Sequence, residues 1–264
     1  MHMPEEVNRL VTDRLADLLF TPDRLSGDNL RQEGAAESQI RFVGNIMIDT
    51  LEAQRDKAGR LKLADIVRDS RINGRDKQDA FDGSRNYALL TLHRPFNVDD
   101  AKILSAIVNF LKNELVQEVT LLWTVHPRTE KQLKAFGLWE PVLATPGLIM
   151  LRPLGYHELL RLNMQAASVL TDSGGLQEEC CVLGTPCLTL RWNTERPITL
   201  REHGGASVLV GNDVGRIRDA CKSVMRRGRV PSRPELWDGR TAGRIVKALA
   251  ESLELRKSEG EGSV

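Results

Sequence analysis

The sequence predicts an α/β protein in which a Rossmann-like parallel sheet is covered by helices. Three observations predict this class. Short apolar runs rich in β-branched residues recur along the chain, helical segments separate them, and most of the runs are apolar throughout instead of alternating. Strands that helices cover on both faces show such continuous runs, and alternating strands and helices build parallel sheets.

The elements follow from these runs in chain order. The expected strands cover residues 40–43, 87–92, 119–125, 148–152, 168–171, 187–190 and 207–210. The expected helices cover residues 5–19, 99–115, 156–165, 176–183, 214–226 and 241–255. Acidic residues open the first helix (Glu5-Glu6) and precede the second (Asp99-Asp100), where a helix amino terminus favours negative charge. The polar stretch 49–85 has no strand signal and is expected to link two units.

Composition limits the classes of function. The chain has 264 residues, enough for one large domain or two smaller ones, and 37 basic residues nearly cancel 36 acidic ones. Neither nucleic acid nor a membrane surface is therefore an expected partner. Because no long apolar run or signal region is present, we expect a cytoplasmic protein. The four cysteines lack C-x-x-C spacing, which favours buried free thiols over a metal site.

The strongest motif is a glycine turn after a buried strand. The strand 168–171 runs into Asp172-Ser173-Gly174-Gly175, and a helix follows. In a parallel sheet this strand end faces the ligand crevice, and the helix points unpaired N–H groups into it. Ser173, Gly174 and Gly175 are therefore candidates for binding a phosphate. The alternative is an ordinary turn whose glycines are chosen for their dihedral angles.

Glu179 lies one helical turn beyond the glycines. If a diphosphate occupies the turn, the carboxylate of Glu179 could accept hydrogen bonds from the two hydroxyls of an adjacent ribose. A plain surface carboxylate is the alternative. Glu178 points about 100° away around the helix and is expected to be structural or solvated.

Two further strand ends carry basic residues. His93-Arg94 follows the strand 87–92, and His126 follows the strand 119–125. Together with the glycine turn they predict a shared anion site at one edge of the sheet, although a single such histidine is more often structural. Arg196, after the strand 187–190, is a candidate ligand contact or part of a helix start.

Taken together, these residues resemble the non-hydrolysing UDP-N-acetylglucosamine 2-epimerases, whose fold is similar to that of the GT-B glycosyltransferases. Six stretches carry the resemblance in order over nearly the whole chain: Pro4–Arg9, Gly44–Asp49, His93–Pro95, Thr171–Glu179, Thr194–Pro197 and Leu236–Arg240.

The resemblance implies a two-domain enzyme, an isomerase that inverts C2 of UDP-N-acetylglucosamine to give UDP-N-acetylmannosamine, without a cofactor. The family reaction is an anti elimination of UDP to 2-acetamidoglucal, followed by re-addition of UDP. UDP and the nucleotide sugar are the implied ligands, and a homodimer or a complementary amino-terminal half is the implied protein partner. A role in cell-surface polysaccharide biosynthesis is also expected.

The resemblance also assigns residues. Ser173, Gly174 and Gly175 look like the family's diphosphate cradle, and Glu179 looks like its ribose anchor. His93 resembles the family's catalytic histidine near the diphosphate, and Glu5 resembles one of its active-site carboxylates. Arg94, His126 and Arg196 would bind substrate, while Leu154 belongs to the segment that bounds the base. The chain departs from the family at Phe96, where a polar residue is usual, and at Leu159, where many members have an aromatic residue.

The matched region begins late in the family's amino-terminal domain. We therefore expect residues 1–60 to be a remnant of that domain with a linker, residues 61–256 to form the UDP-binding domain with a terminal helix, and residues 257–264 to be disordered. The expected function is that of a truncated or split 2-epimerase. The alternatives are a non-catalytic UDP-sugar-binding module and, after it, a GT-B glycosyltransferase.

Overall fold

The computed structural model describes residues 4–72 and 81–261. By its contacts the chain forms two compact units, and each is described by itself. Residues 1–53 and 233–264 belong to the first unit, and residues 54–232 belong to the second. The predicted domains had other boundaries: the first ended at residue 60, and the terminal helix was assigned to the second domain.

The second unit contains a six-stranded sheet in the order β5-β4-β3-β6-β7-β8, and every pairing is parallel. Its strands are β3 (Tyr87–Thr91), β4 (Thr120–Thr124), β5 (Leu148–Leu151), β6 (Ser168–Thr171), β7 (Cys187–Thr189) and β8 (Ser207–Leu209). All six were predicted from the apolar runs. The strand order reverses between β3 and β6, so a crevice is expected at their carboxyl ends.

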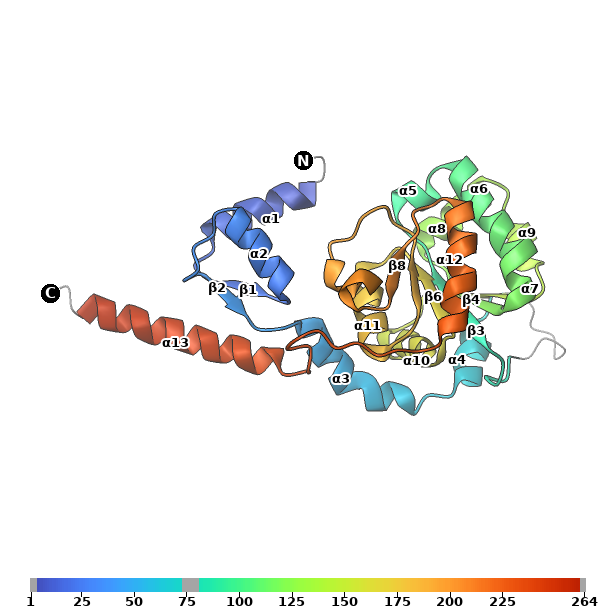
Figure 1. Cartoon of the computed structure of the whole chain (residues 1–264). Coiled ribbons are helices and arrows are strands. Elements are labelled where there is room, and N and C mark those ends of the chain that lie inside the picture. Colours follow the sequence, from blue (N-terminus) through green and yellow to red (C-terminus); the bar gives the residue numbers. More distant parts are fainter. Residues whose placement is uncertain (1–3, 73–80, 262–264) are drawn as a thin grey trace. The chain divides into compact units, whose positions relative to one another are not determined.

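Helices cover both faces of this sheet (Figure 1). Alternate strand residues divide between two cores: Ala88 and Leu90 pack in the larger core, and Tyr87 and Leu89 in the smaller. The larger core is closed by α6 (Ala101–Phe110), η2 (Leu111–Leu115), α8 (Pro127–Ala135), α9 (Trp139–Leu143) and α12 (Val214–Arg227). The smaller core is closed by α4 (Leu63–Ser70), α10 (Tyr156–Gln165) and α11 (Gly174–Leu183).

Short helices complete the second unit: α5 (Pro95–Val98), α7 (Val116–Glu118), η3 (Pro197–Thr199) and η4 (Arg201–His203). The predicted acidic start of the second helix is confirmed, since the carboxylate of Asp100 accepts hydrogen bonds from the N–H groups of Lys102 and Ile103. The four cysteines are free and buried, as predicted.

The first unit contains a two-stranded parallel sheet of β1 (Leu19–Thr21) and β2 (Ile40–Phe42). Its helices are α1 (Pro4–Leu15), α2 (Arg24–Gln32) and α13 (Thr241–Glu261), and α3 (Ile46–Gly59) spans the division between the units. The prediction of one helix over residues 5–19 was wrong at its end, because Leu19 leaves the helix and pairs with Ile40.

Within its described residues the polar stretch 49–85 contains no named strand, as expected; α3 continues through it to Gly59 and α4 follows. One other expectation differs from the structure. The tail was expected to be disordered from residue 257, whereas α13 continues to Glu261.

Candidate functional site

The predicted site residues gather where β3 and β6 end side by side. Thr91 is paired with Thr171 in the register, and their hydroxyl oxygens lie 3.1 Å apart. Each strand then continues into a short connection that opens a helix, α5 after β3 and α11 after β6. His93 and Ser173 are thus delivered at the same level of the sheet edge, as the sequence predicted.

A buried aspartate joins these two connections. Asp172 has no exposed side-chain surface, and its carboxylate accepts hydrogen bonds from the backbone N–H groups of His93 and Arg94. The side chain of Asn97 donates a further bond of 3.1 Å, and Nδ1 of His93 lies 2.9 Å from Oδ1 of Asp172. Burial raises the pKa of Asp172, but the bonds from His93 and from the backbone outweigh burial and hold that pKa below its ordinary value.

The glycine turn at the start of α11 is open. Neither Gly174 nor Gly175 has a positive φ, and a Cβ added to either would meet no atom within 4 Å. Dihedral strain and close packing therefore do not explain the two glycines of this turn. Ser173 is the N-cap of α11, yet its side chain makes no capping hydrogen bond. The first N–H groups of α11 are left for an anion, which a helix amino terminus attracts.

The two glutamates of α11 have different surroundings. Glu178 is buried, and its carboxylate lies 2.7 Å from Nε of Arg196, so it is structural, as expected. Glu179 is half-buried, and burial raises its pKa to about 7, although the neighbouring Asn163 and Tyr156 act to lower that pKa. The ion pair holds Arg196 against α11, while its side chain keeps 43% of its surface exposed.

His126 lies beside His93. The ring centroids are 5.4 Å apart, and Nδ1 of His126 accepts a hydrogen bond of 3.1 Å from the backbone N–H of Arg128. Nε of Arg94 is buried without a hydrogen-bond partner among the described residues. The edge of the sheet therefore holds two imidazoles and a guanidinium beside the open turn, where the sequence predicts a shared anion site.

Three other residues that the sequence analysis discussed are Leu154, Phe96 and Glu5. Leu154, in the connection from β5 to α10, is half-buried and packs with Leu159 against the smaller core. The side chain of Phe96 is turned outward and 42% exposed. Glu5 lies in the first turn of α1, and its side chain lies outside the described part of the structure.

Asp172 and Asn97 were not predicted to be site residues. Both are completely buried. Asn97, in α5, donates hydrogen bonds to the carboxylate of Asp172 and, over 2.9 Å, to the carbonyl of Leu190, so it joins the β3 connection to the ends of β6 and β7. A signal was available in the sequence. Asp172 follows its strand at the level where His93-Arg94 follows the neighbouring one, and an acid at that position can bind the basic connection.

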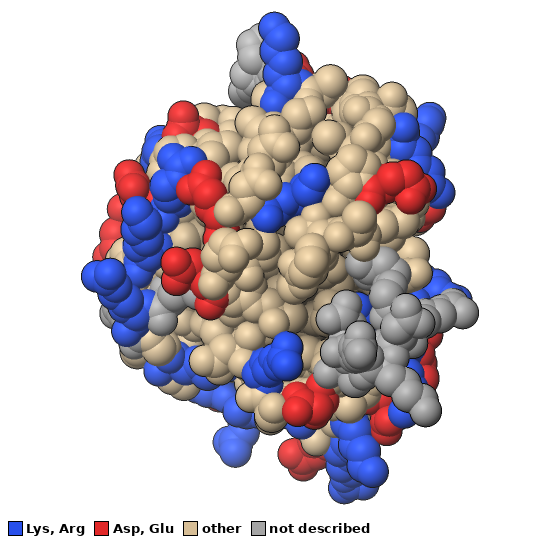
Figure 2. Space-filling view, turned by 90° about the vertical axis from the view of Figure 1, so that its right-hand side faces the viewer, with Lys and Arg blue, Asp and Glu red and all other residues tan. Residues whose placement is uncertain are grey.

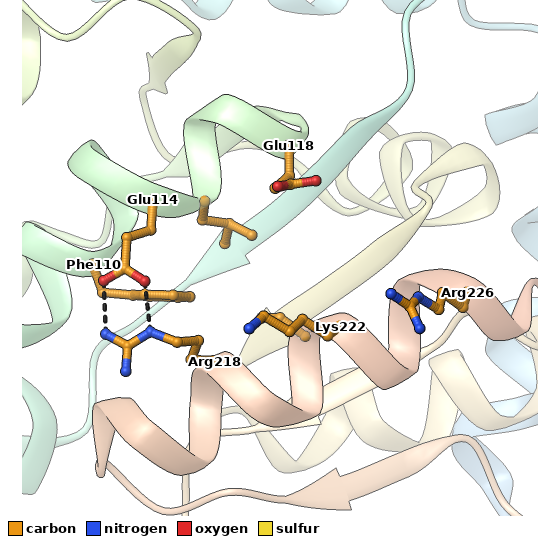
Figure 3. Close-up of a pocket in the computed structure, with 8 residues that line it drawn as sticks. Phe110, Glu114, Glu118, Arg218, Lys222 and Arg226 are labelled. Carbon is orange, nitrogen blue, oxygen red and sulfur yellow. Dashed lines mark hydrogen bonds and ion pairs between the residues drawn. The ribbon is translucent and has the colours of Figure 1, made fainter.

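A separate groove lies between the helical segment that carries Phe110, Glu114 and Glu118 and the helix α12 (Figure 3). It has a volume of about 310 Å³ and is lined by Phe110, Glu114, Leu115, Glu118, Arg218, Cys221, Lys222 and Arg226. Glu114 and Arg218 pair across it, whereas Lys222 and Arg226 follow along α12. None of the predicted site residues lines this groove. Its η2 and α7 residues precede β4, so they lie toward the amino ends of the strands.

The surface charge and the potential metal ligands indicate no second functional site among the described residues. On the face shown in Figure 2, basic and acidic side chains are interspersed without a continuous patch of one sign. Among the described residues, no group of three or more potential metal ligands occurs. No helix within the described ranges is long and apolar enough to cross a membrane.

Comparisons with known proteins agree on one family. Residues 1–250 match the family model described as UDP-N-acetylglucosamine 2-epimerase. The chain is 36% identical over 254 residues to the UDP-N-acetylglucosamine 2-epimerase of Methanocaldococcus jannaschii, covering 94% of this chain and 64% of that protein. It is 32% identical to the UDP-2,3-diacetamido-2,3-dideoxy-D-glucuronate 2-epimerase of Pseudomonas aeruginosa, covering 95% of this chain and 64% of that one.

A solved structure is similar as well. The M. jannaschii enzyme in complex with UDP-GlcNAc and UDP superposes with a TM-score of 0.80 at 34% identity, over 94% of this chain and 65% of that chain. The chain thus spans slightly less than two thirds of the relatives that it matches. The predicted α/β, GT-B-like fold is confirmed over the region that these proteins share.

Proposed function

Because the chain belongs to the UDP-N-acetylglucosamine 2-epimerase family, we propose that it binds UDP-N-acetylglucosamine and inverts C2 to give UDP-N-acetylmannosamine. The observation that carries the proposal is the open glycine turn of α11 beside the His93 and Asp172 pair. An anion-binding helix start and an imidazole meet there at the switch point of a parallel sheet.

Each part of the nucleotide sugar has a candidate contact. Ser173, Gly174 and Gly175 would bind the diphosphate, and Glu179 would bind the ribose hydroxyls. Leu154 would lie against the base, while Arg94, His126 and Arg196 would contribute positive charge and hydrogen bonds. This assignment follows the order of the strand ends along the sheet, from β5 through β3 to β6 and β7.

The proposed chemistry requires an acid, a base and a tightly held diphosphate. Removal of the C2 proton leaves an electron pair that forms the C1=C2 bond, while the C1–O bond breaks and its pair leaves with UDP. Re-addition of UDP to C1 on the face that it left, with return of a proton to the opposite face of C2, completes the inversion at C2. His93 would stabilise the charge that grows on the departing diphosphate, and Glu5 would supply a carboxylate.

The chain's relatives also favour a second substrate. The P. aeruginosa protein is named for a UDP-2,3-diacetamido sugar acid, which shares the UDP and the 2-acetamido group. The proposed contacts with UDP would serve both sugars. We further propose cytoplasmic action in cell-surface polysaccharide biosynthesis, as a homodimer or together with a complementary amino-terminal half.

Calorimetric titration with UDP tests the binding site. Glu179→Ala should weaken UDP binding by about 1 to 3 kcal/mol, because hydrogen bonds between a charged group and the ribose are lost. Glu202→Ala is the matched control, since that side chain is 72% exposed and lies outside the proposed site. Equal UDP affinity of both variants and the parent chain would remove the ribose assignment.

Turnover needs a separate measurement. The chain is incubated with UDP-N-acetylglucosamine in deuterated water, and the C2 proton is followed by NMR. Deuterium at C2 together with the 2-acetamidomannose product supports the epimerase. Binding of UDP without exchange, even when a complementary half is added, would favour the non-catalytic module. Transfer of the sugar to an added acceptor would favour a glycosyltransferase.

A further inference from the structure

We propose that Asp172 is a positioning residue that keeps the proton of neutral His93 on Nδ1, so that Nε2 faces the ligand. The role in the reaction rests on the proposed function, whereas the tautomer itself can be measured without any substrate.

The surroundings of Asp172 determine which atom of His93 carries the proton. The carboxylate is completely buried and receives backbone N–H groups from His93 and Arg94 and the amide N–H of Asn97. Such donors stabilise the ionised form, and the pKa of Asp172 lies below its ordinary value. An ionised carboxylate can only accept hydrogen bonds. Nδ1 of His93, 2.9 Å from Oδ1, must therefore be the donor.

The other ring nitrogen is left for a ligand. One third of the His93 side-chain surface is exposed although Asp172 has none, so the ring extends from the buried carboxylate toward the open edge of the sheet. No hydrogen bond to Nε2 of His93 is present among the described residues. The open turn at Gly174 begins two residues after Asp172 along the chain.

His126 provides an internal contrast. Its Nδ1 accepts the N–H of Arg128, so the hydrogen of the neutral ring lies on Nε2. Two imidazoles whose centroids are 5.4 Å apart are thus held in opposite tautomers by opposite partners.

This arrangement gives Asp172 a defined role in the proposed reaction. With Nδ1–H bound to Asp172, a proton taken up by the ring lies on Nε2, where it can be donated to an oxygen of the departing diphosphate. A carboxylate that orients and stabilises an imidazolium in this way acts through the histidine. In an active full-length enzyme, Asp172→Asn should lower kcat roughly 10- to 100-fold with a smaller change in KM.

The deciding experiment uses the chain as it is, labelled with 15N in its five histidines. Long-range proton–nitrogen NMR spectra at alkaline pH distinguish the two neutral tautomers, and His93→Gln and His126→Gln assign the signals. We expect an Nδ1–H pattern for His93 and an Nε2–H pattern for His126. An Nε2–H pattern for His93 in the wild-type chain overturns the proposal, whether or not any variant folds.

Variants extend the test. Asp172→Asn should shift His93 toward the Nε2–H tautomer, while Asp65→Asn, at an exposed aspartate of α4, should not. An unchanged His93 tautomer in a folded Asp172→Asn variant would also refute the assignment. The same samples are titrated with UDP. Absence of UDP binding would count against the proposed function, whereas the wild-type tautomer pattern would still decide the role of Asp172.

Discussion

At the scale of single residues, Glu179 links the candidate site to stability. Burial raises its pKa to about 7 from an ordinary value of 4.5, so between these pH values the folded chain binds more protons than the unfolded chain. The contribution of Glu179 to stability is therefore complete below about pH 4.5 and is lost as the pH rises through 7. Ribose hydroxyls would replace part of the lost hydration, which is consistent with a buried acceptor at a binding site.

The prediction is that stability decreases between pH 5 and pH 8 by about 1 to 3 kcal/mol through this residue, and that Glu179→Gln removes that decrease. Urea denaturation of both proteins at several pH values measures it. The variant should equal or exceed the parent in stability at pH 8. Parallel stability curves for the two proteins across this range would show that the folded state does not bind an extra proton at Glu179.

At the scale of elements, the two glycines at the start of α11 lower the stability of the helix and leave space where side chains would otherwise lie. Gly174→Ala adds a methyl group where no atom lies within 4 Å and φ is not positive, so the folded state should accept it. We expect a gain of about 0.4 to 1 kcal/mol in the free energy of unfolding, because alanine restricts the unfolded chain. The same methyl group would obstruct a diphosphate and weaken UDP binding by about 1 to 3 kcal/mol.

Gly243→Ala in the first turn of α13 is the matched control, since its added Cβ also meets no atom within 4 Å. It should stabilise the chain without changing UDP affinity. Thermal denaturation and calorimetry on both variants separate the two effects. If Gly174→Ala bound UDP as well as the parent, the glycine turn would not be the diphosphate site.

The sequence predicts the strands better than the contacts between them. The six strands of the larger sheet were predicted because each is a continuous apolar run, a pattern that local sequence carries. The strand β1 was missed because three residues directly after a helix give no period of their own. The hydrogen bonds that the buried carboxylate of Asp172 accepts depend on the register of β3 against β6, which only the tertiary structure specifies. The ion pair between Glu178 and Arg196 likewise joins separate elements.

At the scale of the whole molecule, the apolar cluster around the two strands of the first unit is small. The buried core cluster around its strands contains Leu19, Leu30 and Ile40, and a two-stranded sheet is marginal in water. Two helices of this unit carry exposed apolar stripes: Val7, Val11 and Leu15 on α1, and Val246, Leu249 and Leu253 on α13. The residues of each stripe recur at helical spacing, so they lie along one face. The relatives are longer by about a third of their own length.

Exposed stripes of this kind favour association. We predict that the purified chain associates with itself in a concentration-dependent manner, and that Leu15→Glu and Leu253→Glu together lower its apparent mass in light-scattering chromatography. Val230→Glu is the control, because Val230 is half exposed and lies in the second unit. UDP affinity should be unchanged in all these variants, since the proposed contacts with UDP lie in the second unit. A chain that stays monomeric at every concentration would show that the stripes do not drive association.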